Sequence, residues 1–403
     1  MIPYLLMAFL YIMVAVLMAV EASFSSFHIL DWFNGMVWLR IHFITLGVTT
    51  QLIYGIMPIL TARYYDLPHP ETRWDVWATL NTGIVLLLVG IPLTSSVPII
   101  SGGTLIFIST VLLIIQLSKI RPSDTTKPAS VGRKFYIAGL AYFLVGIIVG
   151  TGLFTGWIEP LHITGNAVEV HIHANNWGLL SLVFAGLFVD LYEVWAKRPL
   201  ANPKSINSIF WMMNVGAFGL IFGPWFLGAS PLVKWLVLVP GLVLHLVATI
   251  WLLVNAIKPL RGDKVSIGLW HLLGSYFWIL APIAMAPFVV LGIGNLPADT
   301  IEATAPQALI YGWVLQYGMA VIPYFFQRFL FKNKNAELGG TKLSLILVNL
   351  GSVFLWASIF IEPLQSTLHG TAYLLWTISM IPVVTDLWTK VRTGMARVET
   401  AVS

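Results

Sequence analysis

Residues 169–195 of the chain read EVHIHANNWGLLSLVFAGLFVDLYEVW. This stretch places His171 and His173 at the start of an otherwise apolar segment. At 1.5 Å per residue, a helix of about 20 residues crosses the roughly 30 Å of hydrocarbon in a bilayer. The stretch therefore predicts a membrane-spanning helix over residues 171–195 with two ionisable side chains near one end.

Apolar runs of similar length recur along the whole chain, which is 58% hydrophobic and only 10% charged. Ordinary soluble domains carry roughly 25% charged residues, so this composition excludes a soluble globular protein. We predict an all-α, polytopic membrane helix bundle with about twelve spans. They lie at residues 2–20, 36–61, 76–92, 97–118, 135–155, 171–195, 207–228, 232–257, 266–292, 305–330, 342–361 and 366–388.

Two of these predictions have alternatives. The first run has no Lys or Arg before it, and it is longer than the roughly 7–15 apolar residues of a signal peptide, so we interpret it as a span. Only Pro92–Pro98 separates the third run from the fourth, and the two could instead form one interrupted hairpin.

Basic residues are divided unequally among the predicted loops. With a cytoplasmic N-terminus, all of the 22 Lys and Arg residues except Arg40 and Lys234 fall on the inner side. Because inner loops of membrane proteins are enriched in Lys and Arg, this predicts an integral protein of the cell (cytoplasmic) membrane with both termini in the cytoplasm. The same rule accounts for the formal net charge of +5 and leaves no reason to expect nucleic-acid binding. No loop is long enough for a separate domain, so residues 1–403 are predicted to form a single membrane domain.

The absence of cysteine excludes disulfides, iron–sulfur clusters and haem attached through C-x-x-C-H. Any metal must be bound by nitrogen or oxygen ligands. Phosphate-binding loops, nucleophile elbows and H-E-x-x-H motifs are also absent.

Six of the nine histidines fall at or within the predicted spans: His42, His171, His173, His245, His271 and His369. An ionisable side chain inside a bilayer costs several kcal/mol unless it is paired or ligated, so each is a functional candidate. The alternative for any single one is a neutral histidine hydrogen-bonded between helices. We expect His42, His171, His173 and His369 near the outer ends of their spans, His245 nearer mid-depth and His271 at the inner end.

The spacing of His171 and His173 limits what they can ligate. Residues two apart on a helix project about 200° from one another, so the pair cannot chelate one ion but can each ligate a haem on opposite faces. Gly178 and Ala174 are expected to leave room for flat macrocycles. Arg40, two positions before His42, suits a haem propionate, or it extends to the membrane interface.

These residues resemble a known family. The segment that begins at Glu169 is similar to the H-x-H-x-x-x-x-G helix of the catalytic subunit (subunit I) of haem-copper oxidases and nitric oxide reductases, especially the branch with b-type haems. Arg40-Ile41-His42 resembles the start of that family's second helix. The resemblance implies the subunit I fold and two b haems, with His42 and His173 ligating a low-spin haem. It further implies that His171 is the only protein ligand of a high-spin haem, at which catalysis takes place.

Other features of the sequence bear on a second metal site and on the roles of the remaining histidines, which stay open. No His-His pair occurs, and whether copper or non-haem iron is bound stays open. A weaker likeness to the NnrS family of haem- and copper-containing membrane proteins runs through Leu269–Tyr276 and Leu368–Ala372. Ile158–Leu161 recurs as Ile361–Leu364, and the same offset relates His42 to His245. This suggests a 6+6 internal duplication, in which His245 and His369 contribute to a second metal site or ligate another haem.

The sequence thus predicts a b-haem membrane oxidoreductase of the terminal oxidase or nitric oxide reductase type. Quinol or an external cytochrome or cupredoxin would donate electrons, and O2 or NO would be bound or reduced, with accessory subunits as further partners. One alternative is a non-catalytic membrane protein that handles haem, NO or copper. Another is a haem-free transporter built from 6+6 repeats.

Overall fold

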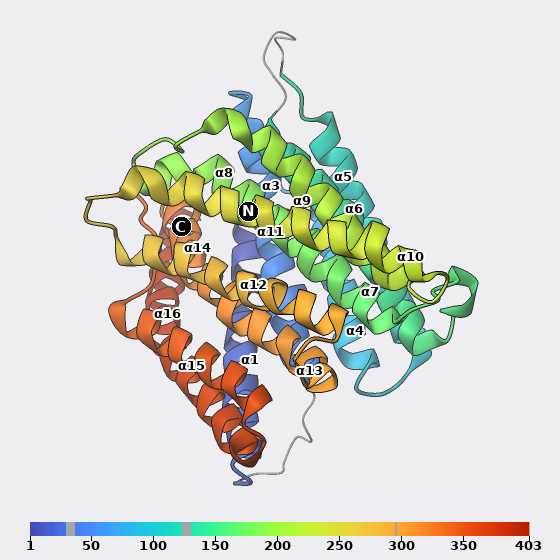
Figure 1. Ribbon diagram of the computed structural model, residues 1–403. Helices are drawn as coiled ribbons and strands as arrows, with labels where there is room; N and C mark the ends of the chain where they lie inside the picture. The colour runs from blue at the N-terminus through green and yellow to red at the C-terminus, as the bar shows by residue number, and fades with distance from the viewer. Residues whose placement is uncertain (30–36, 123–129, 295, 403) are drawn as a thin grey trace. The chain divides into compact units, whose positions relative to one another are not determined.

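The computed structural model describes residues 1–29, 37–122, 130–294 and 296–402 (Figure 1). These residues form helices and connecting loops, with no strand among them. Residue 36, the predicted first residue of the second span, lies outside this part of the chain. The α-helices are α1 (Ile2–Ser26), α2 (Val37–His42), α3 (Thr50–Tyr64), α4 (Trp74–Gly90), α5 (Ser96–Lys119), α6 (Val131–Thr155), α7 (Ala167–His173), α8 (Ser181–Ala196), α9 (Ile206–Phe226), α10 (Pro231–Val233), α11 (Val239–Ile257), α12 (Ile267–Leu291), α13 (Ala298–Leu309), α14 (Gln316–Phe325), α15 (Lys342–Phe360) and α16 (Gln365–Val402).

Several consecutive helices join into longer stretches, and within the described residues eleven stretches are long and apolar enough to cross a membrane. They are Ile2–Ser26, Val37–Tyr64, Ser96–Lys119, Val131–Thr155, Ala167–Ala196, Pro203–Phe226, Pro231–Leu260, Ile267–Leu291, Thr300–Leu330, Lys342–Phe360 and Glu362–Gly394. The third predicted span corresponds to α4, an apolar helix of 17 residues that is shorter than the others. It is separate from α5 and packs against it. The prediction of an all-helical polytopic membrane protein is confirmed.

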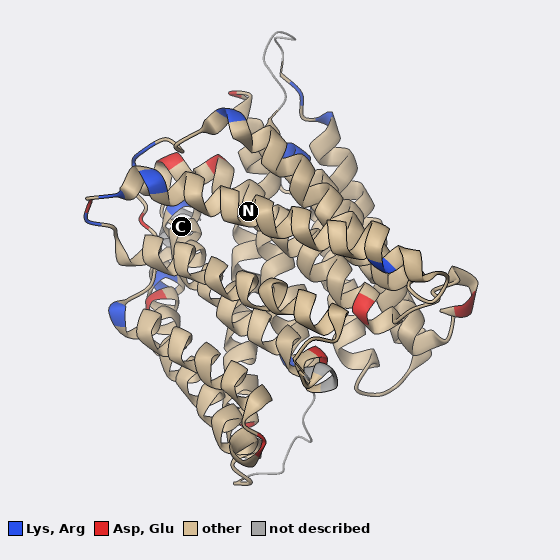
Figure 2. Ribbon diagram, in the orientation of Figure 1, with Lys and Arg blue, Asp and Glu red and all other residues tan. Residues whose placement is uncertain are grey.

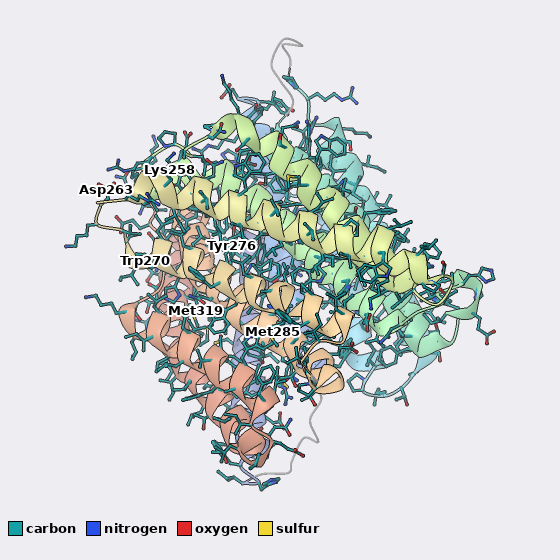
Figure 3. All side chains as sticks on the ribbon, in the orientation of Figure 1. Lys258, Asp263, Trp270, Tyr276, Met285 and Met319 are labelled. Carbon is teal, nitrogen blue, oxygen red and sulfur yellow. The ribbon has the colours of Figure 1, made fainter. Side chains whose placement is uncertain are left out.

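The charged side chains agree with this assignment. Lys, Arg, Asp and Glu lie mostly in loops and near helix ends, and long stretches of the helices carry none (Figure 2). On α12, where Figure 3 labels Trp270 and Tyr276, the side chains of Trp270 and Phe277 are exposed whereas that of Tyr276 is buried. A helix that exposes large apolar side chains in this way is suited to contact with lipid.

The chain divides into two compact units. The first unit comprises Met1–Leu52 and Gly262–Ser403, and the second comprises Ile53–Arg261. In the first unit, α1 and α15 pack along α16, and α12 packs against α14. In the second unit, α6 contacts α5, α7 and α8, and α9 packs against α11.

The described residues contain five π-helical segments: Phe43–Thr49 in the second span, Ala174–Leu180 in the sixth, Lys234–Leu238 in the eighth, and Ile310–Leu315 and Phe326–Leu330 in the tenth. Three of these segments, Phe43–Thr49, Ala174–Leu180 and Ile310–Leu315, each contain a glycine that packs against an aromatic residue of the preceding span. A Cβ atom would lie 2.7 Å from Cγ of Tyr11 at Gly47, 2.4 Å from Cβ of Tyr142 at Gly178 and 2.8 Å from Cγ of Trp278 at Gly312. These three segments thus share one local packing feature. Because π-helical segments are rare and concentrate at functional sites, the spans that contain them are the first place to look for one.

The predicted six-span duplication rests on two copies of Ile-Glu-Pro-Leu. Glu159–Leu161 and Glu362–Leu364 both form a single 3-10 turn. A proline at the second position of each turn favours this conformation locally. The matching turns are what identical sequences would form in any case, and the 6+6 duplication stays a prediction.

Candidate functional site

The helix that carries His171 and His173 has a well-defined start. The side chain of Asn166 accepts hydrogen bonds from the backbone N–H groups of Val168, at 3.0 Å, and Glu169, at 3.4 Å. Such a cap satisfies donors that have no partner within the helix. It starts α7 at Ala167 and places both histidines in the last turn before the π-helical segment.

His171 faces α6. Its Nδ1 lies 2.8 Å from the carbonyl oxygen of Gly146. A Cβ atom at Gly150 would lie 2.5 Å from the imidazole, so the absence of a side chain at Gly150 leaves the space in which the ring lies.

His173 faces a different helix. Its Nδ1 lies 2.6 Å from the carbonyl oxygen of Leu220 on α9. The ring of Trp177, one turn further along, meets the imidazole edge-on with the ring centroids 6.3 Å apart. The imidazoles of His171 and His173 therefore contact two different helices, α6 and α9.

His42 occupies the corresponding place in the second span, directly before the π-helical segment Phe43–Thr49. Its Nδ1 lies 2.7 Å from the carbonyl oxygen of Trp38, one turn earlier in α2. The imidazole stacks on the indole of Trp38, with 4.0 Å between the ring centroids.

These contacts determine the tautomer of His42, His171 and His173. A backbone carbonyl oxygen can only accept a hydrogen bond, so Nδ1 must carry the proton and Nε2 must carry the lone pair. All three side chains are half-buried. Histidines that ligate metals almost always donate their other ring N–H to a carbonyl, carboxylate or water in this way. The donor set therefore fits axial ligation of haem iron through Nε2.

The space beside Gly178 and Ala174, where room for a macrocycle was expected, is filled by neighbouring side chains. Gly178 packs against Tyr142 of α6 and Ile221 of α9. Ala174 is fully buried in an apolar cluster with Val149 and Ile221. The expectation that Gly178 and Ala174 leave room for haem is wrong, because the neighbouring helices fill that space.

His245 and His271 differ from these three because both are fully buried. Nε2 of His271 lies 3.3 Å from the carbonyl oxygen of Thr341 and 3.0 Å from Oγ of Ser344. His271 therefore carries its proton on Nε2, the opposite tautomer to His171. Nε2 of His245 lies 3.2 Å from Oγ of Ser181.

Arg40 is buried rather than extended to a surface, with 4% of its area exposed. Its Nη1 lies 3.4 Å from Oε2 of Glu21, and its guanidinium carbon lies 5.1 Å from the ring centre of Tyr373. The snorkelling alternative for Arg40 is therefore wrong, and a carboxylate of the chain itself is one of its partners. The role of Arg40 toward a haem propionate stays a prediction.

His369 lies in the first turns of α16 and is half-buried. Its Nδ1 lies 2.9 Å from Oγ of Ser26, and that hydroxyl donates its only proton to the carbonyl oxygen of Ala22, 2.7 Å away. The hydroxyl must then accept from Nδ1–H, which leaves the lone pair of His369 on Nε2.

The structure leaves two ligand pairings untested. His42 belongs to the first unit and His173 to the second, and the same holds for His369 and His245. A low-spin haem shared by His42 and His173 stays a prediction, as does a second metal site that includes His245 and His369. Within the described residues, no three His, Cys, Asp or Glu side chains form a group able to hold a metal ion.

Some of the polar residues around Arg40 were missed by sequence reasoning. Tyr373 donates a hydrogen bond to Oε1 of Gln307, and Tyr311 stacks on Trp376 with ring centroids 4.4 Å apart. Tyr and Trp are so frequent in membrane spans that nothing in the sequence distinguishes these from ordinary packing residues. They come from α13, the π-helical segment Ile310–Leu315 and α16, and only the tertiary packing of the first unit brings them together.

No known protein family matches this chain, and no curated protein is similar to it in sequence.

Proposed function

We propose that this protein is a membrane oxidoreductase that binds b-type haem and binds or reduces O2 or NO. One observation carries the proposal: His42, His171 and His173 each donate Nδ1–H to a backbone carbonyl and keep the lone pair on Nε2. This is the arrangement that an axial haem ligand requires.

The positions of these histidines add support. His42 and His173 both directly precede a π-helical segment, in spans that are four apart in the chain. Equivalent positions in the second and sixth spans are what the predicted low-spin pair would use. His171 faces α6, away from the side on which His173 faces α9. It is therefore the candidate ligand of a separate haem, which would supply the chemistry for binding or reducing a diatomic gas.

The residues around these ligands have their own roles. The carbonyl groups of Gly146 and Leu220 hold the two imidazoles of α7 in a single tautomer and orientation. Gly150 leaves the space in which the His171 ring lies. The electron donor, quinol or an external protein, and any copper or non-haem iron are left open by this proposal.

The absorption spectrum of the purified protein tests the proposal directly. We expect an intense Soret band and, after reduction, the sharp bands of low-spin b-type haem. CO added to the reduced protein should shift part of the spectrum. His171→Ala should abolish the CO shift and leave the low-spin bands, whereas His69→Ala, a change at an exposed loop histidine, should alter neither. A folded but colourless protein would contradict the proposal and favour a transporter.

The proposed orientation, with both termini in the cytoplasm, has a separate test. The chain has no cysteine, so single cysteines can be labelled without background. Impermeant reagents should label a cysteine at Thr164 in intact cells, and one at Asn335 only after permeabilisation. The reverse pattern would invert the proposed topology.

A further inference from the structure

His369 lies in a polar cluster of the first unit that contains none of the three proposed haem ligands, His42, His171 and His173. The end of α1 is joined to the start of α16 at three points. Oγ of Ser23 donates to the carbonyl oxygen of Gly370 at 2.9 Å, Ser26 accepts from His369, and Ser366 donates to the carbonyl oxygen of Ser26. A half-buried histidine held this firmly presents Nε2 as a hydrogen-bond acceptor in a fixed place.

The other side of the cluster supplies donors. The His369 ring lies against Tyr373, with 4.8 Å between the ring centroids, and the guanidinium of Arg40 lies over the same tyrosine. Tyr311 also contacts Tyr373, at 5.0 Å between ring centroids. Nε of Arg40 and the hydroxyl of Tyr311 are buried and have no hydrogen-bond partner among the described residues. Buried donors without a partner are uncommon in native proteins and call for an explanation such as a bound molecule.

Apolar side chains that lie close to His369 in the chain are exposed. Ile361, Leu364 and Leu374 expose 43%, 50% and 39% of their area at the same end of the eleventh and twelfth spans. A ligand that reaches His369 from this side must be soluble in lipid.

We infer that His369, Tyr373 and Arg40 form a binding site for a lipophilic hydroquinone, whose hydroxyl group donates to Nε2 of His369. Three features of the cluster favour this ligand class. Nε2 of His369 offers a lone pair, Nε of Arg40 and the hydroxyl of Tyr311 are buried donors without an acceptor among the described residues, and the aromatic rings of His369 and Tyr373 suit a flat ring. A carboxylate would accept from Arg40 and Tyr311, but it has no proton to donate to Nε2 of His369, so two acceptors would face each other. This inference names the electron donor of the proposed function and rests on it for that role, although binding itself does not require haem.

Titration of the purified protein with decylubiquinol, followed by quenching of tryptophan fluorescence, tests the site, because Trp376 stacks on Tyr311 beside it. We expect saturable binding that His369→Leu weakens about tenfold or more, which is the effect of losing one hydrogen bond of about 1.4 kcal/mol. Ser26→Ala keeps the imidazole but removes its anchor, and should weaken binding by a smaller factor. His69→Ala is the control and should bind as the unchanged protein does.

Three results would overturn the inference. The first is binding that does not saturate and only reflects partition into detergent, and the second is unchanged affinity in both His369→Leu and Ser26→Ala. The third is loss of a haem band in His369→Leu, because that result would make His369 an iron ligand. Thermal unfolding of each variant shows whether it is folded, and Ser26→Ala provides a test if His369→Leu is not. Colourless protein that binds decylubiquinol through His369 would contradict the proposed function and leave this site intact.

Discussion

The two helix segments that carry His42 and His173 look alike but hold their histidines differently. Both histidines directly precede a π-helical segment and donate Nδ1–H to a carbonyl oxygen. For His42 that oxygen belongs to Trp38, one turn back in the same helix, and the same residue stacks on the ring. For His173 the oxygen belongs to Leu220 on α9, which is 47 residues away in the chain.

This difference separates local from tertiary control of a ligand. Two contacts of His42, the Nδ1–H bond to the carbonyl of Trp38 and the stacking on its indole, lie within α2, and we expect these two to survive changes in the packing of other helices. The orientation of His173 depends on α9 lying beside α7, so a change that shifts either helix should move the ligand. Four predictions test this comparison.

The largest expected effect is the loss of a ligand. His42→Ala and His173→Ala should each abolish the same low-spin haem signal, because the two residues are proposed to bind one iron from opposite sides. Reduced-minus-oxidised spectra of the two variants provide the measurement. If the two variants lost different bands, the proposed pairing of the first and second units' histidines would be wrong.

Removal of the fully buried His271 should have a structural effect only. His271→Ala deletes the hydrogen bonds to Thr341 and Ser344 and leaves a cavity, which together cost about 2–4 kcal/mol of stability. Thermal unfolding in detergent should show a lower midpoint with an unchanged haem spectrum. A lost haem band in this variant would mean that His271 is a ligand after all.

Added bulk at the π-helical segments should cost less. A Cβ atom at Gly47 or Gly178 would lie within 3 Å of Tyr11 or Tyr142, and overpacking of this kind costs about 1–3 kcal/mol. Gly178→Ala should also shift the low-spin band, because it moves the helix that carries His173 against its tertiary anchor. Gly47→Ala should leave that band in place.

Gly318→Ala is the matched control for both variants. There a Cβ atom would meet only the flexible tip of Ile322, at 3.3 Å. Equal shifts of the low-spin band in the Gly47 and Gly178 variants would remove the distinction between local and tertiary control.

The smallest effect is expected at Trp38. Trp38→Leu removes the stacking on His42, worth about 0.5–1.5 kcal/mol for an aromatic pair, but keeps the backbone carbonyl that accepts from Nδ1. Haem content should be unchanged and the stability slightly lower, as measured by thermal unfolding. Complete loss of the low-spin band would show that stacking, and not the carbonyl, orients His42.

Much of the fold could be predicted from the sequence, as the twelve apolar runs show. Each corresponds to a helical stretch, because about 20 apolar residues in lipid can satisfy their backbone hydrogen bonds only as a helix. The short α4 shows where this signal weakens, since its 17 residues lie at the lower limit for a span. The π-helical segments had no signal, because nothing in the composition of Phe43–Thr49 or Ala174–Leu180 differs from an ordinary apolar helix.

For the candidate site, too, some features follow from the sequence alone and others only from the tertiary structure. The spacing of His171 and His173 by itself determined that they point in different directions, because a helix rotates about 100° per residue whatever surrounds it. The sequence could not say which nitrogen each imidazole presents, since that depends on carbonyl groups of α6 and α9 more than 20 residues away in the chain. Nor could it show that Gly178 is filled by Tyr142, or that Arg40 is buried beside Glu21 and Tyr373. Those outcomes depend on which helices lie side by side, and apolar helices of similar composition do not encode their neighbours in any local pattern.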